Sequence, residues 1–173
     1  ARLEAGLTLA EPIEGDVVGL IQDNGKIDMG KLVEVESQIL PRISRNCRLG
    51  RLAVTATLPG GESEFTESKP GEIERKVISE MGLADEDWQV SGIPRLSSKG
   101  SRRALTVTFS DFSVEEAGDV EGDRLSNRFS EGPREGELWH SDGCSLRLRF
   151  SLPSGTYATV LMREFMRAPL TQY

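Results

Sequence analysis

Arginine residues at two places in the second half of the chain could bind a ligand, because a planar guanidinium suits phosphate oxygens and base edges. Arg102 and Arg103 follow Lys99 in a cationic stretch that we expect to be a flexible loop. There they could bind phosphate or form a solvated charge run. Arg163 is flanked by apolar residues, where an unpaired guanidinium would be costly. Its partner could be a carboxylate, Glu164 among them, or a backbone phosphate, and we favour an ion pair.

Gly155 and Tyr157 form the third candidate, at the junction between an expected strand and an expected helix. Glycine permits the close backbone approach that such a turn requires. A side chain two residues later can face a cleft. A plain turn glycine followed by a core aromatic would give the same pattern, so both interpretations stay open on the residues alone.

Cysteine and histidine give no sign of a metal or redox site. Cys47 and Cys144 have no Cys or His near them in sequence, so neither a disulfide framework nor a zinc site is indicated, and we interpret both as buried thiols. The single histidine, His140, is interpreted as a surface or packing residue.

Composition is typical of a soluble globular protein, with 37% hydrophobic and 28% charged residues and no apolar run near the ~20 residues of a membrane span. Net charge is −7 and uneven: residues 1–90 hold 17 acidic and 10 basic side chains, and residues 91–173 hold 11 of each, ten of the cations being Arg. The overall acidity argues against a free-standing nucleic-acid-binding module. If RNA is bound, we expect the second half to bind it.

The first half of the chain predicts a hairpin, two helices and a strand. β-branched runs flank the turn signal Asp23-Asn24-Gly25, and helical spacing of apolar residues ends before glycine at two places. We expect a hairpin over 17–35, a helix over 36–48, a strand over 52–58, and a helix over 70–82 that buries Ile73, Val77, Ile78 and Met81.

After Trp88 the composition changes to Ser, Gly, Pro and cations, and we place a domain boundary at residues 88–92. Four Gly and nine charges among twenty positions predict a mobile surface loop over 118–137. Alternation and helical spacing predict strands over 104–109 and 145–152, a turn at 153–155 and a helix over 156–167. The chain opens at Ala1 without the order of a signal peptide, and we interpret it as a fragment.

One string in the second half is specific enough to indicate a family. LRLRFSLPSGTYATVLMREFMRAP resembles the closing motif of the tRNA pseudouridine synthase D (TruD) family, in which an apolar strand runs into Leu-Pro-x-Gly-aromatic-Ala-Thr and then a helix carrying Arg-Glu. The matching residues are Leu152, Pro153, Gly155, Tyr157, Ala158, Thr159, Arg163 and Glu164. Upstream, residues 99–103 and Asp111-Phe112-Ser113 resemble the family's Gly-x-Arg-Arg segment and its following Asp.

Farther back, EGDVV and the segments 50–56 and 70–75 resemble the second half of the family's insertion domain in its archaeal style. The resemblance implies an α+β chain in two parts. Residues 1–90 would be the carboxy-terminal part of the insertion domain, and residues 91–173 the carboxy-terminal part of the pseudouridine-synthase catalytic domain, closing its mixed sheet. The family's nucleophilic Asp lies earlier, in a Lys-Asp-Arg-like motif, and neither that tripeptide nor the family's Asn-x-Phe-Gly occurs here.

The implied activity is isomerisation of uridine to pseudouridine in tRNA or another structured RNA, by a cytoplasmic enzyme without membrane contact, cofactor or metal. In the implied mechanism the Asp attacks the nucleotide, the uracil leaves nitrogen and rotates, and C5 bonds to the ribose. Extruding the base costs about a few kcal/mol, partly recovered by stacking. Tyr157 is the candidate stacking ring, Gly155 shapes its turn, Arg163 could pair with the absent Asp, and Arg102 and Arg103 could contact phosphate.

Two rival functions remain on the sequence alone. A non-catalytic RNA-binding or scaffold module would explain the missing nucleophile, but it predicts a basic surface that the net charge does not provide. A small α+β hydrolase would use Asp111, Asp142 or Glu164, yet no Ser-His-Asp order, Gly-x-Ser-x-Gly elbow or ligand cluster supports it. We expect the fragment to be inactive alone. Its oligomeric state has no signature in the sequence.

Overall fold

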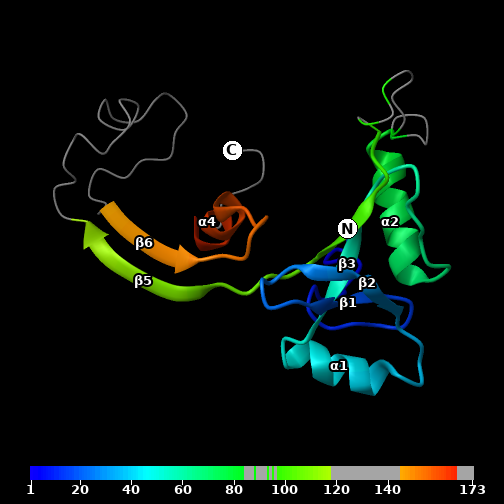
Figure 1. Ribbon diagram of the computed structural model, residues 1–173, viewed down its shortest axis with the longest axis horizontal. Helices are drawn as coiled ribbons and strands as arrows, with labels where there is room; N and C mark the ends of the chain where they lie inside the picture. The colour runs from blue at the N-terminus through cyan, green and yellow to red at the C-terminus, as the bar shows by residue number, and fades with distance from the viewer. Residues whose placement is uncertain (84–87, 89–92, 94, 96, 118–144, 167–173) are drawn as a thin grey trace. The chain divides into compact units, whose positions relative to one another are not determined.

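The computed structural model describes residues 1–83, 88, 93, 95, 97–117 and 145–166. These form two compact units, Ala1–Thr108 with the segment from Pro153 onward, and Phe109–Leu152. The described elements, in chain order, are β1 (Val17–Ile21), β2 (Ile27–Glu34), α1 (Leu40–Arg48), β3 (Leu52–Leu58), α2 (Lys69–Glu80), β4 (Ser101–Ala104), β5 (Ser110–Ala117), β6 (Ser145–Ser151) and α4 (Ala158–Met166) (Figure 1).

The first unit is built on a four-stranded antiparallel sheet in the order β2-β1-β3-β4. Val18 in the central strand pairs with Val33 on one side and with Val54 on the other. The turn between β1 and β2 contains Gly25 at φ +77°, and the predicted hairpin is therefore confirmed. The predicted bounds of β3 are also those observed.

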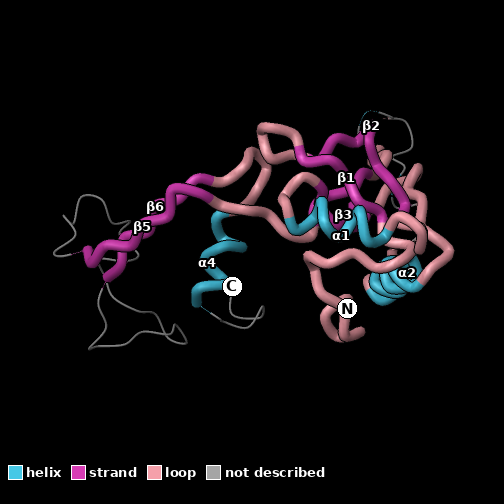
Figure 2. The backbone as a smooth tube through the Cα atoms, turned by 90° about the horizontal axis from the view of Figure 1, so that it is seen from below, coloured by secondary structure: helices cyan, strands magenta, loops and turns pink. Residues whose placement is uncertain are grey.

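Helix α1 supplies the second layer of the core. Pro41 lies in its first turn, where a missing N–H costs nothing. Ile43 packs against the buried Val18, Val35 and Val54, and the partly buried Ile39, Leu40 and Cys47 extend the same contact. Figures 1 and 2 show α1 alongside strands β1 and β3. Cys47, predicted to be buried, is half-buried, and this burial raises the pKa of its thiol, with a smaller contribution from the charge of Asp16.

Helix α2 is joined to the sheet through a polar bridge. The backbone N–H and the hydroxyl of Thr57 donate to the two carboxylate oxygens of Glu74, at 3.0 and 2.8 Å. Arg102 Nη2 lies 2.8 Å from Glu74 Oε1, with the two side chains only 11% and 15% exposed. Arg102 also donates to both threonine hydroxyls of β3, at 2.9 Å to Thr55 and 2.8 Å to Thr57. One carboxylate thus connects α2, β3 and β4.

The sequence prediction was wrong about β4. Residues 101–104 form a strand paired with β3, Arg103 opposite Ala56 and Arg102 opposite Thr57, where a flexible loop was expected. Residues 105–109, expected to be a strand, follow it without regular structure. The cationic composition predicted a loop, but pairing with β3 and the ion pair with Glu74 override local composition.

The sheet continues across the expected boundary at 88–92. Strands β3 and β4 lie on opposite sides of that segment and pair directly, and the compact units divide at Thr108 and Leu152 instead. Residues 89–92 themselves lie outside the described residues. The assignment of 1–90 and 91–173 to two domains of a family is a separate matter and stays a prediction.

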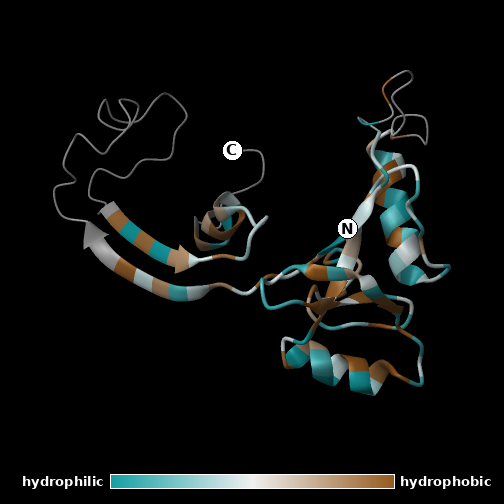
Figure 3. Cartoon of the chain, in the orientation of Figure 1, coloured by the Kyte–Doolittle hydropathy of each residue, from teal (hydrophilic) through white to brown (hydrophobic). Residues whose placement is uncertain are grey.

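The second unit consists, among its described residues, of β5 paired antiparallel with β6. Apolar residues alternate along β6 as predicted, visible as alternating bands in Figure 3. Helix α4, which belongs to the first unit, lies within the predicted 156–167. The expected loop over 118–137, His140, Asp142 and Cys144 lie outside the described residues.

One expected core residue is exposed. Met81 has 65% of its surface accessible, and Ile73, Val77 and Ile78 of the same helical face are only partly buried. The reason is that this face of α2 lines a cavity instead of a packed layer.

The ion pair between Glu74 and Arg102 should carry much of the stability of α2. Removing one partner of a largely buried ion pair leaves the other charge buried without a partner. Glu74→Ala should therefore lower the free energy of unfolding by about 3–5 kcal/mol. The matched control is Glu80→Ala on the same helix, whose pair with Lys76 spans 3.6 Å between side chains 61% and 71% exposed. It should cost about 1 kcal/mol or less. If urea denaturation shows the same loss of unfolding free energy for Glu74→Ala and Glu80→Ala, the stabilising role of the Glu74–Arg102 ion pair is contradicted.

Candidate functional site

A tight turn carries Tyr157 between β6 and α4. Gly155 adopts φ +88°, a conformation that a side chain would strain, and the N–H of Thr156 donates to the carbonyl of Pro153 at 3.1 Å. The N–H of Val160 then donates to the carbonyl of Tyr157 at 3.1 Å, which starts α4. The Tyr157 side chain is 63% exposed. Within the described part of the chain Tyr157 therefore does not belong to a packed core, and Gly155 occupies a turn; the stacking role stays a prediction.

Arg103 of β4 fastens this turn to the sheet. Its Nη2 donates to the carbonyl of Gly155 at 2.9 Å, and its Cζ lies 5.7 Å from the centroid of the Tyr157 ring. A guanidinium at that distance is attracted by the negative face of the ring, by about 0.5–1 kcal/mol at an exposed site. Residues of two separate sequence candidates, Arg103 on one side and Gly155 with Tyr157 on the other, thus lie together.

The tip of the β1–β2 hairpin meets the same turn. A Cβ built on Gly25 would lie 2.5 Å from Cβ and Cγ of Pro153, closer than real side-chain contacts. Only glycine permits this approach, because any side chain would displace Pro153 or the hairpin. The Asp-Asn-Gly signal predicted the hairpin, but nothing in the sequence indicated what its tip would contact.

An exposed aromatic ring next to a guanidinium can hold a flat, negatively charged ligand. The ring supplies a stacking surface, and Arg103 supplies a fork of N–H donors that suits phosphate oxygens. None of Gly155, Tyr157 and Arg103 is a nucleophile at neutral pH, so this cluster can bind and orient a ligand but cannot break a bond.

Arg163 lies half-buried in the last turn of α4. Its guanidinium makes no hydrogen bond or ion pair with any residue that the structure describes, Glu164 included. Of the partners considered from the sequence, Glu164 is therefore not used. The guanidinium is available to an anion outside the described residues.

Arg102 has a different environment from its neighbour. Its donors are engaged by Thr55, Thr57 and Glu74 within the sheet and α2. The phosphate contact expected for Arg102 stays a prediction, and each of these bonds holds the side chain inside the fold.

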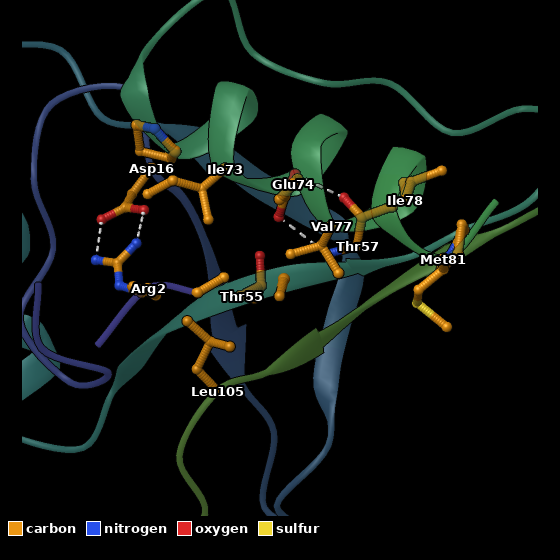
Figure 4. Close-up of a pocket in the computed structure, with 14 residues that line it drawn as sticks. Arg2, Asp16, Thr55, Thr57, Ile73, Glu74, Val77, Ile78, Met81 and Leu105 are labelled. Atoms are coloured by element: carbon orange, nitrogen blue, oxygen red, sulfur yellow. Dashed lines mark hydrogen bonds and ion pairs between the residues drawn. The ribbon is translucent and has the colours of Figure 1, made fainter. Parts of the chain in front are cut away.

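A cavity of about 330 Å³ lies between α2, strand β3 and the N-terminal segment, and Leu105, directly after β4, also lines it (Figure 4). Its lining is mostly apolar, and both of its carboxylates are paired. Asp16, 1% exposed, accepts from Arg2 at 2.6 and 2.8 Å and from the N–H of Ile13 at 2.7 Å. Glu74 forms the bridge already described. Neither carboxylate has the freedom of a catalytic base, so we interpret the cavity as a packing gap.

Of the acidic candidates named from the sequence, Asp111 is also unsuited to catalysis. Asp111 is exposed, and hydrogen bonds from Ser151 and Ser110 lower the pKa of its carboxyl, which weakens it as a base. Within the described ranges, no group of three or more His, Cys, Asp or Glu could hold a metal ion. The same part of the chain contains no helix that is both long and apolar enough to cross a membrane.

Comparison with known proteins gives a consistent result. Residues 1–165 match the family model described as tRNA pseudouridine synthase D (TruD). Two curated archaeal relatives named "Probable tRNA pseudouridine synthase D", from Methanosarcina mazei and Natronomonas pharaonis, are each 34% identical over 96% of this chain. The matched region covers 34% and 32% of those relatives, so the chain spans about a third of their length.

The fold agrees with this match. A crystal structure of a tRNA pseudouridine synthase D (TruD) homologue from Methanosarcina mazei superposes with a TM-score of 0.72 at 32% identity. The superposition covers 99% of this chain and 35% of that one. The α+β expectation from the sequence is thereby confirmed at the coarse level of a mixed fold of helices and strands.

The contact between Gly25 and Pro153 should hold the Tyr157 turn in place. Gly25→Ala and Gly50→Ala both put a side chain at positive φ, +77° and +67°, and this backbone strain should cost about 1–2 kcal/mol of unfolding free energy in each variant, before any contact with a neighbour. Only the first meets a neighbour, because a Cβ at Gly50 has nothing within 4 Å. Gly25→Ala alone should shift the NMR signals of residues 153–157 and speed exchange of the Thr156 N–H about tenfold. Matching spectra at these residues in both variants would contradict the contact.

Proposed function

The chain belongs to the tRNA pseudouridine synthase D (TruD) family, and we propose that this protein isomerises uridine to pseudouridine in tRNA. The 173 residues contain no Lys-Asp-Arg string, so the nucleophilic Asp of the reaction comes from elsewhere in the protein. In this proposal residues 1–90 belong to the carboxy-terminal part of the insertion domain and residues 91–173 to that of the catalytic domain. The chain binds and orients the substrate.

Tyr157 is the residue we assign to the extruded uracil. The observation that supports this is its exposure: 63% of the side chain is accessible on a turn fixed at both ends, by the carbonyl of Gly155 and by the start of α4. Stacking on an aromatic ring recovers part of the energy spent in extruding a base. Arg103, against the same ring, places a positive charge where the phosphate of that nucleotide would lie.

Arg163 is assigned to the missing nucleophile. The residue is half-buried, and its guanidinium has no partner among the residues described. A carboxylate beside it would keep its negative charge, because an adjacent cation lowers the pKa of an acid. An ionised carboxylate is the form that attacks. Arg102 is assigned to the fold, since its donors are engaged by β3 and α2.

Tyr157→Ala in the full-length protein should lower kcat/KM about ten- to a hundredfold, because stacking worth about 1–3 kcal/mol is lost. Tyr157→Phe keeps the ring and should cost much less. Single-turnover rates on a tRNA substrate measure the effect. Melting temperatures of both variants should stay near that of the wild type, since the side chain is mostly exposed. An Ala variant that keeps its rate per folded molecule would reject the stacking role.

The 173-residue chain alone should form no pseudouridine in tRNA, because it lacks a nucleophile, and should bind tRNA weakly at net charge −7. A full-length protein, with the length of the family's relatives, should convert uridine to pseudouridine. Release of tritium from C5-labelled uridine gives the measurement. Turnover by the 173 residues alone would overturn the assignment of the nucleophile. A full-length protein that binds tRNA without turnover would favour the RNA-binding or scaffold alternative.

A further inference from the structure

Four exposed arginines lie on and directly after helix α1, and nothing in the reaction proposed above uses them. We call these four residues the arginine face: Arg42, Arg45, Arg48 and Arg51. We propose that the arginine face binds the phosphate backbone of the RNA substrate, as a contact separate from the Tyr157 turn. The inference rests on the proposed function for the identity of the RNA, and it adds a docking surface to it.

The charge pattern around α1 is unlike the rest of its unit. Residues 37–61 contain four arginines and no acidic residue, although 28 acidic residues among 173 would give about four in a run of that length. The surrounding residues 1–90 carry a net charge of −7. A positive surface in an acidic unit concentrates its attraction for phosphate at one place, which favours one docking orientation.

The packing of α1 directs these side chains to solvent. Ile43 and the partly buried Ile39, Leu40 and Cys47 take up the side that contacts the sheet, and all four arginines are exposed. Figure 3 shows hydrophilic and hydrophobic residues alternating along α1.

Few carboxylates among the described residues neutralise the arginine face. Arg48 lies 3.6 Å from Glu11, with the two side chains 71% and 63% exposed, a pair that solvent and salt screen strongly. The side chains of Arg42, Arg45 and Arg51 make no hydrogen bond or ion pair with the residues described. Three guanidinium forks are therefore available to an external anion.

Helix stability explains only half of the pattern. Arg45 and Arg48 lie in the last turn of α1, where the helix dipole favours cations. Arg42 lies in the first turn, where the dipole disfavours a cation and where no acidic residue offsets it. Arg51 lies beyond the helix. These two residues weaken or do not affect the helix, and binding of an anion gives them a role.

The geometry suits a polyanion. Arg42 and Arg48 are six residues apart, or about 9 Å along the helix axis, which exceeds the size of a single phosphate group. Arginine also forms paired hydrogen bonds to phosphate oxygens. Contacts of this kind position the RNA without reading its sequence.

The test compares two triple variants of the full-length protein with equal net charge. Arg42/Arg45/Arg51→Gln removes the free cations of the arginine face, and Lys31/Lys69/Lys76→Gln removes three exposed lysines elsewhere in the same unit. Dissociation constants for a tRNA transcript are measured between about 50 and 200 mM salt. The arginine variant should reduce the slope of log K against log salt by about 2–3, since each phosphate contact contributes about 0.7–0.9. The lysine variant should leave the slope nearly unchanged.

Turnover separates this inference from the proposed function. With saturating tRNA, the arginine variant should keep kcat while its KM rises, because the Tyr157 turn is untouched. If the arginine variant has a reduced salt slope but the full-length protein forms no pseudouridine, the docking surface is supported and the isomerase function is rejected. Normal turnover with an unchanged slope would reject the docking surface, as would equal slope losses in both variants. If the triple variant melts early, Arg42→Gln and Arg51→Gln, outside the last helical turn, should each reduce the slope by about 0.7–0.9, and no reduction overturns the inference.

Discussion

The position of the Tyr157 turn depends on the hydrogen bonds that the Glu74 carboxylate accepts. It accepts from Thr57 of β3 and Arg102 of β4, so it fixes the helix and the edge strand together. Neighbouring side chains in a strand point to opposite faces of a sheet. Because Arg102 is held on the side of α2, Arg103 projects to the other side, where it reaches Gly155 and Tyr157. A buried ion pair thus orients an exposed cation one residue away.

Local signals predicted most of the fold. The β-branched runs around Asp-Asn-Gly, the alternation of 52–58 and the helical spacing around Ile43 each agree with the element observed. Strand β4 was missed because Ser, Gly, Lys and Arg have the composition of a loop. Its pairing with β3 spans more than forty residues of sequence, and no local pattern carries such information. Met81 was wrongly expected in a core. Helical periodicity shows which side of a helix is apolar, but it does not show whether another layer of the protein covers that side.

The candidate site was predictable by residue type but not by arrangement. Arg103 and the pair Gly155 and Tyr157 were singled out as separate candidates, and the string around Tyr157 indicated the family that the comparisons then identified. Their contact depends on the register of β4, which the sequence did not reveal. Arg102 shows the same limit. Its neighbour faces solvent while it is held inside the fold, and two adjacent arginines in a cationic run look alike in sequence.

The turn that carries Tyr157 is held by the sheet, not by its neighbours in sequence. It follows β6 directly, yet it groups with the unit of β1–β4, through the close approach of Gly25 to Pro153 and the bonds of Arg103. A two-stranded pair such as β5–β6 is at best marginally stable alone and would fix such a turn poorly. The four-stranded sheet has a packed core of Val18, Val35, Ile43 and Val54 and can hold it precisely. A change at the hairpin tip can therefore move the Tyr157 turn without altering any residue of that turn.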